Sequence, residues 1–309
     1  MVELVVVGSV ALDDIKTPSG EVVGALGGAA VYSSVSASFF TNVGVVGVVG
    51  NDFPDNYVEF LIEKGICTKG LAISDGATFK WHGQYNGDMN QANTLKTDLG
   101  VFADFKPSIP EEYKKARYLF LANIDPAIQK SVIEQMENPE LIVMDTMNYW
   151  IENKKEELFD VIEMCDIVIM NSEEANQLFE THNTIQAGKQ LLKTGLKAAI
   201  IKKGEHGALV FTNPTDADGR HLISVFSAPA YPLEDVKDPT GAGDSFAGGF
   251  MGWLAKTGDI SDENIRKAVI YGSACASYSA QGFGLSQLKE IAMEDIEQRY
   301  DEFKKISEF

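Results

Sequence analysis

The segment from Asp238 to Gly249, DPTGAGDSFAGG, places four glycines and two carboxylates just before an expected helix. Beyond it, apolar side chains recur at helical spacing, at Phe246, Phe250, Trp253 and Leu254. Small residues in the loop let the amides of Ala242, Gly243 and Asp244 converge at the positive end of that helix. A loop of this kind can bind an anion such as a phosphoryl group.

Asp244 stands directly beside this anion site. Its carboxylate could take the proton of an attacking hydroxyl, a role worth roughly 10²- to 10⁴-fold in rate. The positive end of a helix should lower the pKa of such a carboxylic acid. The alternative interpretation is that Asp244 only caps the helix and that the glycines only permit tight packing of the helix on a sheet.

The elements that must position these residues alternate along the chain. Six apolar runs predict buried strands, at residues 4–10, 43–50, 117–123, 141–145, 166–171 and 198–204. Helical patterns lie between them, at residues 54–65, 126–137, 154–165 and 184–195. This alternation predicts an α/β fold with a mostly parallel, doubly wound sheet that is covered on both faces.

One region interrupts this alternation. From Thr78 to Leu99, aromatic residues alternate and Asn86-Gly87 signals a two-residue hairpin turn. Residues 13–28 predict a further strand beside this hairpin. We therefore expect a small β lid over a substrate site, although an ordinary surface hairpin remains an alternative. The predicted division assigns residues 1–12, 27–77 and 106–309 to an α/β core, and residues 13–26 and 78–105 to the lid.

Composition excludes several classes of function. The chain has 309 residues, 45% of them hydrophobic, which is enough for one large domain with a small appendage. A net charge of -19 argues against nucleic acid and anionic membranes as partners. We interpret Cys67, Cys165 and Cys275 as reduced core residues of a cytoplasmic protein, because they are widely spaced and odd in number. No apolar stretch approaches the ~20 residues that cross a bilayer.

Three motifs together resemble the ribokinase/PfkB family of carbohydrate and nucleoside kinases: DPTGAGDSF at 238–246, GGAA at 27–30 and NSEE at 171–174. The resemblance extends along nearly the whole chain and implies a ribokinase-like three-layer α/β/α sandwich with a small β-sheet lid. It also implies an ATP-dependent kinase, in which Asp244 is the catalytic base and the amides from Gly241 to Asp244 form the anion hole. The sequence lacks the phosphate-binding motifs of dinucleotide and P-loop enzymes.

The resemblance places the metal and the donor phosphates near one strand end. In its N-x-x-E motif, Glu174 would hold Mg²⁺ through water and Asn171 would reach the phosphates of ATP. The residues themselves also fit a helix-capping box, and both roles can hold at once. Asp145, at the end of the preceding strand, is a weaker metal candidate.

Further family positions map onto loops. Lys202, Gly204, Gly207 and Thr240 would approach the nucleotide, with residues 227–238 and 268–284 walling the adenine. Many family members bind K⁺ beside the anion hole. The corresponding residues here, which could equally be simple turn residues, are Asp238, Thr240, Gly282 and Ser286.

On the acceptor side, the resemblance assigns Asp13 to grip hydroxyl groups, with Gly27 and Gly28 letting a hydroxylated ring approach the backbone. The chain departs from related sugar kinases at Tyr32, where they commonly carry asparagine. Tyrosine offers one hydroxyl and a large face. Together with Trp81 on the lid, it could stack an aromatic ring, although lid packing or a dimer contact would also explain these aromatics.

We therefore expect a kinase that phosphorylates a primary alcohol of a sugar. A nucleoside kinase with the same residues is the first alternative, and a non-catalytic nucleotide-binding regulator is the second. An open hairpin leaves sheet edges and apolar rings that need cover, which predicts a homodimer through the lid.

Overall fold

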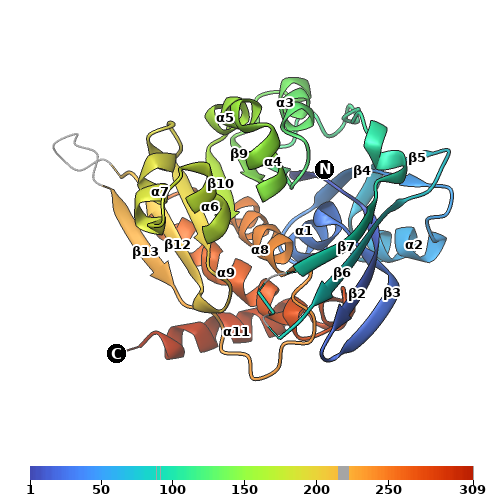
Figure 1. Ribbon diagram of the computed structural model, residues 1–309. Coiled ribbons are helices and arrows are strands. Elements are labelled where there is room, and N and C mark those ends of the chain that lie inside the picture. The colour runs from blue at the N-terminus through green and yellow to red at the C-terminus, as the bar shows by residue number, and fades with distance from the viewer. Residues whose placement is uncertain (88, 91, 215–222, 309) are drawn as a thin grey trace.

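Nine strands of the described residues form one large sheet, in the order β13-β12-β11-β10-β9-β8-β1-β4-β5 (Figure 1). The computed structural model describes residues 1–87, 89–90, 92–214 and 223–308. All neighbouring strands are parallel except where β12 joins β11 and β13. The strands are β1 Leu4–Val7, β4 Val43–Gly50, β5 Cys67–Ser74, β8 Tyr118–Leu121, β9 Leu141–Asp145, β10 Ile167–Asn171, β11 Ala198–Lys202, β12 Ala208–Thr212 and β13 Ser224–Ala228.

Helices cover both faces of this sheet and give three layers (Figure 1). One face carries α1 Ala29–Ser38, α2 Asp55–Glu63, α8 Ala242–Thr257, α9 Asp262–Ala280 and α10 Ser286–Glu290. The other carries α3 Pro126–Gln135, α4 Asn148–Asn153, α5 Lys155–Met164, α6 Ser172–Leu178 and α7 Thr184–Leu192. The central strands are buried on both faces, which explains why they are runs of Val, Ile and Leu rather than alternating patterns. The predicted fold class is therefore confirmed.

Two 3₁₀ turns and one last helix complete the core. The turns are η1 Gly100–Asp104 and η2 Gly204–His206, and the helix is α11 Met293–Ile306. α11 packs against α9 through a separate cluster of buried side chains that includes Tyr271 and Phe303. Within the described part of the chain, no helix has the length and apolar character that crossing a membrane requires.

A second sheet of four strands stands beside the core, in the order β3-β2-β6-β7 (right side of Figure 1). Its strands are β2 Ala11–Thr17, β3 Gly20–Gly27, β6 Phe79–Tyr85 and β7 Ala92–Asp98. The sequence led us to expect one strand in residues 13–28, but the structure has two, because the turn at Pro18-Ser19 reverses the chain between them. The first of these strands begins at Ala11, directly after the run 4–10 that was predicted as one core strand, and that core strand ends at Val7.

The expected two-residue turn at Asn86-Gly87 was wrong. Tyr85 pairs with Ala92, so six residues, 86–91, connect β6 to β7. Residues 88 and 91 of this connection lie outside the described residues. The pairing also shifts register between His82 and Gly83, where β7 carries an extra residue. Asn-Gly is typical of a two-residue turn. Here the two strands stop pairing at Tyr85 and Ala92, so Asn86-Gly87 is part of a longer connection.

Candidate active site

The amino end of α8 lies at the carboxyl edge of the large sheet. The residue before the helix has a backbone conformation that glycine adopts readily. Gly241 is the N-cap residue, with a left-handed backbone at φ 73°. The amide of Ala242 donates to the carbonyl of Pro239 at 3.1 Å, so this predicted anion donor already serves the turn. The amides of Gly243 and Asp244 belong to the first helical turn, where the helix itself supplies no acceptor. These two amides are therefore the donors available to an anion.

A lysine side chain converges on the same loop. A methyl group at Gly243 would lie 3.1 Å from Lys202 Nζ, which places the ammonium group against the loop. Lys202 also forms an ion pair with Asp145 Oδ2 at 2.9 Å. Burial lowers the pKa of Lys202, but the charges of Asp145 and Glu174 outweigh burial and raise it overall. Lys202 is therefore a permanent cation beside the predicted anion site.

Asp244 is the third residue of α8 and is half-buried. Its backbone carbonyl accepts a hydrogen bond from Ser33 Oγ at 3.0 Å, which fixes the first turn against α1. Burial of the carboxyl and then the charge of Asp145 raise the pKa of Asp244 to about 6, while Lys202 opposes them. The expectation of a lowered pKa was wrong, because the loss of water outweighs the field of the helix end.

Asn171 and Glu174 form the capping box that the sequence left open as an alternative. The Glu174 amide donates to Asn171 Oδ1 at 2.8 Å, and the Asn171 amide donates to Glu174 Oε2 at 2.7 Å. Register pairing puts Asn171 directly beside Lys202 at the ends of β10 and β11. Burial and the charge of Asp145 raise the pKa of Glu174. Glu174 keeps a second carboxyl oxygen that the capping box does not use.

The carboxylates here fit a cation that retains water. Among the described residues, no three His, Cys, Asp or Glu side chains lie close enough to hold a metal ion by themselves. Mg²⁺ usually keeps several waters and binds through one or two carboxylates together with substrate phosphates. The neighbouring negative charges that raise the pKa values of Glu174 and Asp244 are also those that a divalent cation would offset. The donor set therefore suits Mg²⁺ bound through water.

A cavity of about 850 Å³ opens in front of the loop. The predicted site residues in its wall are Lys202, Gly204, Gly207, Ala242 and Gly243. Small side chains of α9, among them Ala276 and Ala280, form another wall, together with residues 230–236. The lid contributes Gly87, Met89 and Asn90 from the connection between β6 and β7. The cavity thus lies between the core and the small sheet, whereas other predicted site residues, among them Asp244, Asn171, Glu174, Thr240 and Asp13, are not among its lining residues.

The four residues predicted for K⁺ lie in two segments that Asp238 joins. Its Oδ1 accepts the Thr240 amide and its Oδ2 accepts the Gly284 amide, both at 2.9 Å. A methyl group at Gly282 would lie 2.3 Å from Ser286 Oγ, which shows how tightly the last glycine turn is wound. Asp238 thereby attaches the anion loop to the turn that follows α9. This is the structural role in a turn that the sequence left open as the alternative to K⁺ binding.

The acceptor residues of the prediction gather where β2 and β3 leave the core. Asp13 is 4% exposed, and a methyl group at Gly27 would overlap its carboxyl. Gly28 has φ +93° and closely contacts the backbone of Ser9, so a side chain would not fit there. Burial and then the charge of Asp238 raise the pKa of Asp13 to about 7, although a hydrogen bond from the Gly28 amide lowers it.

Tyr32 does not present a face to an acceptor, contrary to the expectation. Tyr32 is 1% exposed, and a methyl group at Gly241 would lie 2.4 Å from the Tyr32 ring. The ring is therefore packed beneath the anion loop. The hydroxyl is buried without a hydrogen-bond partner in the described structure. From the sequence, tyrosine in place of asparagine suggested a different contact with the acceptor. In the structure, the Tyr32 ring instead fills the space beneath Gly241.

Trp81 lies on the same face of the lid as Asp13, because the two residues are register partners on β6 and β2. Its indole lies over Gly83, where a methyl group would come within 2.0 Å of the ring, and its Nε1 donates to Thr94 Oγ1 at 3.1 Å. Tyr85, four residues after Trp81 on the same strand, was not among the predicted site residues. Thr240 Oγ1 donates to the Tyr85 hydroxyl at 3.3 Å, which links lid and anion loop. The alternation of aromatic residues in β6 was the signal for it.

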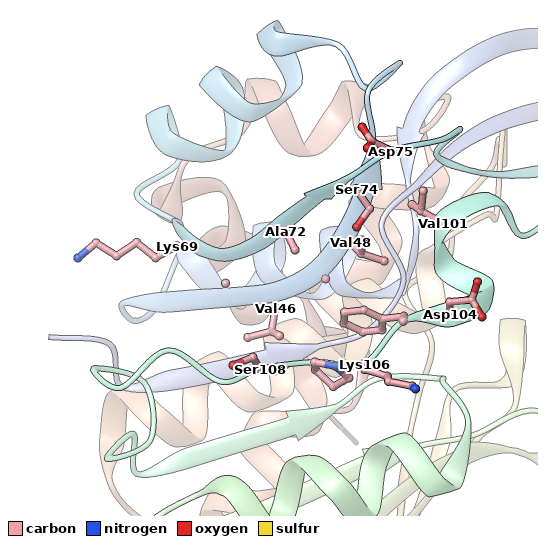
Figure 2. A pocket seen from close by; sticks show the side chains of 14 residues that line it. Val46, Val48, Lys69, Ala72, Ser74, Asp75, Val101, Asp104, Lys106 and Ser108 are labelled. Atoms are coloured by element: carbon pink, nitrogen blue, oxygen red, sulfur yellow. The ribbon is translucent and has the colours of Figure 1, made fainter.

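A second cavity, of about 380 Å³, lies apart from these residues between β4, β5 and residues 101–108 (Figure 2). Its floor is apolar, with Val46 and Val48 from β4. Lys69 extends away from it (Figure 2) and forms an ion pair with Glu112 at 2.7 Å. It contains none of the predicted site residues, so it belongs to a different part of the surface.

The chain is similar to known kinases in sequence and in fold. A cytidine kinase from Thermococcus kodakarensis is 30% identical over 257 residues, which cover 81% of this chain and 88% of that protein. The structure of a Methanocaldococcus jannaschii nucleoside kinase, a member of the ribokinase family, has a TM-score of 0.75 at 23% identity and covers 97% of this chain and 98% of its own. An Escherichia coli protein described as a ribokinase II, in complex with ATP and Mg²⁺, has a TM-score of 0.77 at 19% identity and covers 98% and 100%.

The two structures are below 25% identity and therefore establish the shared fold alone. The family model is more informative, because it matches residues 1–291 under the description pfkB family carbohydrate kinase. That range contains the anion loop, the Asn171–Glu174 motif and both segments of the lid sheet. The chain belongs to the pfkB family of carbohydrate kinases.

Proposed function

We propose that the protein is an ATP-dependent kinase that transfers the γ-phosphoryl group to a primary hydroxyl of a nucleoside. The observation that carries this proposal is that Gly243 and Lys202 line one wall of the large cavity and that Asp244 directly follows Gly243 at the start of α8. An anion site, a fixed cation and a carboxylate of raised pKa are the groups that phosphoryl transfer to an alcohol needs.

ATP fits the part of the cavity between the anion loop and α9. The small side chains of Ala276 and Ala280 leave room for a flat base, and Gly204 and Gly207 let the backbone approach the phosphates. Asn171, beside Lys202 at the strand ends, points to phosphate recognition as a second role. When bound, Mg²⁺ would be held by Glu174 through water and would neutralise charge on the donor phosphates.

In the transfer step, Asp244 accepts the proton of the acceptor hydroxyl as its oxygen bonds to the γ-phosphorus. The bond from that phosphorus to the β–γ bridging oxygen breaks, and ADP carries away the electron pair. The amides of Gly243 and Asp244 and the ammonium of Lys202 stabilise charge on the moving group. A pKa of about 6 leaves Asp244 ionised at neutral pH, as a base requires.

The acceptor side favours a nucleoside. Asp13 and Trp81 are cross-strand partners on one face of the lid, so a ligand whose hydroxyls bind the carboxylate can lay a flat ring on the indole. The sequence similarity to a cytidine kinase supports the same choice. A free sugar, the acceptor that the sequence first favoured, remains the second candidate, since Asp13 and the glycines at 27 and 28 need only hydroxyl groups.

We also propose that the small sheet acts as a lid and as a dimer surface. Gly87, Met89 and Asn90 of its connection between β6 and β7 line the nucleotide cavity, so closure of the small sheet would exclude water that competes for the phosphoryl group. Strand β7 is an exposed edge of that sheet, and Leu95 on it is 64% exposed. A second copy could pair with this edge. In analytical ultracentrifugation, wild type should sediment as a dimer and Leu95→Lys as a monomer. A Leu95→Lys variant that sediments like the wild-type dimer would contradict an interface through this sheet.

K⁺ binding near Asp238 and Ser286 also remains a proposal, because the structure shows the two segments joined by hydrogen bonds rather than an ion site. Replacing K⁺ with Na⁺ or choline at constant ionic strength tests it. A rate that falls only when K⁺ is withdrawn supports the proposal, and equal rates in all three salts contradict it.

The central test is ATP consumption against a panel of nucleosides and of sugars without a base. We expect the largest kcat/KM with a nucleoside, and a fall of roughly 10²- to 10⁴-fold for Asp244→Asn. Below about pH 6 the wild-type rate should also fall, because Asp244 becomes protonated. Asp160→Asn, which changes an exposed partner of Lys130, is the matched control. Full activity of Asp244→Asn would remove the base from the mechanism, and activity with sugars alone would replace the nucleoside.

A further inference from the structure

We infer that helix α11 completes the nucleotide site, with Arg299 as the positioning residue of the wall that faces the base. α11 begins at Met293, after the last residue that the family model matches. The inference rests on the proposed nucleotide cavity, but it concerns residues that contact the wall of that cavity from behind.

Arg299 is sandwiched between two aromatic rings. Its guanidinium carbon lies 3.4 Å from the centre of the Tyr278 ring and 4.4 Å from that of the Tyr231 ring. Tyr278 belongs to α9, whereas Tyr231 belongs to the segment 230–236 that lines the cavity. One side chain therefore clamps the two halves of the wall together. A planar guanidinium can stack on both faces, which the ammonium of a lysine cannot.

The same guanidinium also fixes the polar part of the wall. Arg299 Nη1 donates to Ser277 Oγ at 2.9 Å and to Gln281 Oε1 at 3.0 Å. Ser277 in turn donates to the carbonyl of Ala274 at 2.7 Å. Ser277 lines the cavity, and these two bonds of its hydroxyl hold its side chain in one orientation. Arg299 thus helps to fix the position of this surface.

A second contact from α11 holds Tyr231. Its hydroxyl donates to Glu302 Oε2 at 2.6 Å, and its ring meets Phe303 at 5.6 Å between ring centres. Residues 229–233 contain no helix or strand that could fix Tyr231 locally. The stack with Arg299, the bond to Glu302 and the ring contact with Phe303, all from α11, therefore order this part of the wall.

The burial of Arg299 argues for a role beyond stability. The residue is 8% exposed, its partners Ser277 and Gln281 are neutral, and its Nε has no hydrogen-bond partner in the described structure. The carboxylate of Glu302 acts on Arg299 electrostatically but forms no ion pair with it, and a buried cation without a direct ion pair is a poor means of stabilising a fold. An apolar side chain of similar length could fill this space, so the guanidinium is better explained by the wall that it organises.

The test uses the full chain and two probes, ATP with Mg²⁺ and inorganic tripolyphosphate, in titration calorimetry. Arg299→Lys and Arg299→Met should raise the Kd for ATP about tenfold or more and leave the Kd for tripolyphosphate within twofold, because only ATP uses the base wall. Tyr231→Phe keeps the stack and loses the bond to Glu302, so its effect on ATP should be smaller. At saturating ATP, kcat should stay within twofold of wild type.

Arg266→Lys is the matched control. Arg266 also stacks on an aromatic ring, Phe226 at 5.4 Å, and pairs with Asp262, but it does not line the cavity. It should leave both affinities unchanged. Equal weakening of both probes in the Arg299 variants, or unchanged ATP affinity in them and in Tyr231→Phe, would overturn the inference. Wild-type protein that binds neither probe would overturn the proposed function, and the inference with it.

Discussion

At the scale of single residues, the crevice gathers more negative charge than its own cation can balance. Asp145 and Glu174 act on Lys202, and the charge of Asp244 reaches both Glu174 and Asp13. Burial then raises the pKa of each of the last three carboxyls. A site built in this way favours a ligand that brings cations with it, as a magnesium nucleotide does.

Tyr32 allows the clearest test of a single atom. Its hydroxyl is buried and has no partner, so Tyr32→Phe removes no hydrogen bond and should leave the melting temperature unchanged or slightly raised. If the ring only supports the loop at Gly241, kcat/KM should stay within about threefold of wild type. Differential scanning fluorimetry and steady-state kinetics measure the two quantities.

Tyr113→Phe is the matched control for that substitution. Tyr113 is equally buried, but its hydroxyl donates to the carbonyl of Cys67 at 2.7 Å. Loss of that bond should destabilise the fold by about 1–2 kcal/mol. A large fall in activity of Tyr32→Phe, with the fold intact, would instead show that the hydroxyl contacts the acceptor in the complex.

Residue types alone located most of the candidate site but not the state of its groups. The glycines and Asp244 could be recognised because few other patterns place small residues and a carboxylate at the start of a helix. The pKa of Asp244 could not, since its direction depends on burial by residues distant in sequence. Tyr32 misled for a similar reason: only the packed structure shows Gly241 against its ring.

At the scale of elements, three adjacent strands and one helix deliver the site. β9, β10 and β11 end at Asp145, Asn171 and Lys202, and α8 begins beside them at Ala242. The strands were predictable because buried parallel strands are continuous apolar runs. β5, β12 and β13 were not predicted. β5 and β13 lie at the sheet edges, where burial is partial and the apolar pattern is weaker. β12 is fully buried between two strands, and it was missed although its residues form an apolar run.

Gly241→Ala tests whether the start of α8 is built for its conformation. An alanine would have to adopt φ +73° and would press its methyl group against the ring of Tyr32. The left-handed backbone alone costs about 1–2 kcal/mol, and relief of the overlap would move the loop that holds the anion. We expect a lower melting temperature and a fall in kcat of at least about 10²-fold, because displaced donors no longer meet the phosphoryl group.

Gly258→Ala separates these two effects. Gly258 caps the other end of α8 with φ +65°, and a methyl group there would come no closer than 3.8 Å to another group. It should therefore share the backbone cost and keep full activity. Equal loss of activity in both variants would mean that the stability of α8, rather than the position of its first turn, limits catalysis.

At the scale of the whole molecule, two sheets meet at one crevice. Asp13 comes from the small sheet and Asp244 from the core, and Tyr85 of the lid bonds to Thr240 of the anion loop. Long-range contacts of this kind depend on how the sheets pack, so the sequence predicted a small second sheet without its four-stranded pairing. The net charge of -19 adds a general repulsion that acts against compaction as pH rises.

The crevice carboxyls predict how the stability of the unliganded protein depends on pH. The pKa of Asp13 rises from 3.8 to about 7 on folding, so its contribution to stability is complete below about pH 4 and is lost as pH rises toward 7. At about 1.4 kcal/mol per pKa unit, this is roughly 4 kcal/mol as an upper figure. Asp244, with a pKa of about 6, acts in the same direction over a narrower range.

Asp13→Asn should therefore raise the free energy of unfolding at pH 8 and change it little at pH 4, while it abolishes phosphorylation of the acceptor. Asparagine keeps an acceptor for the Gly28 amide and removes only the buried charge. Urea unfolding at several pH values measures the effect, with Asp160→Asn as the exposed control. An equal fall in the free energy of unfolding of Asp13→Asn at pH 8 and at pH 4 would show that the buried charge of Asp13 does not destabilise the fold, and would contradict its raised pKa.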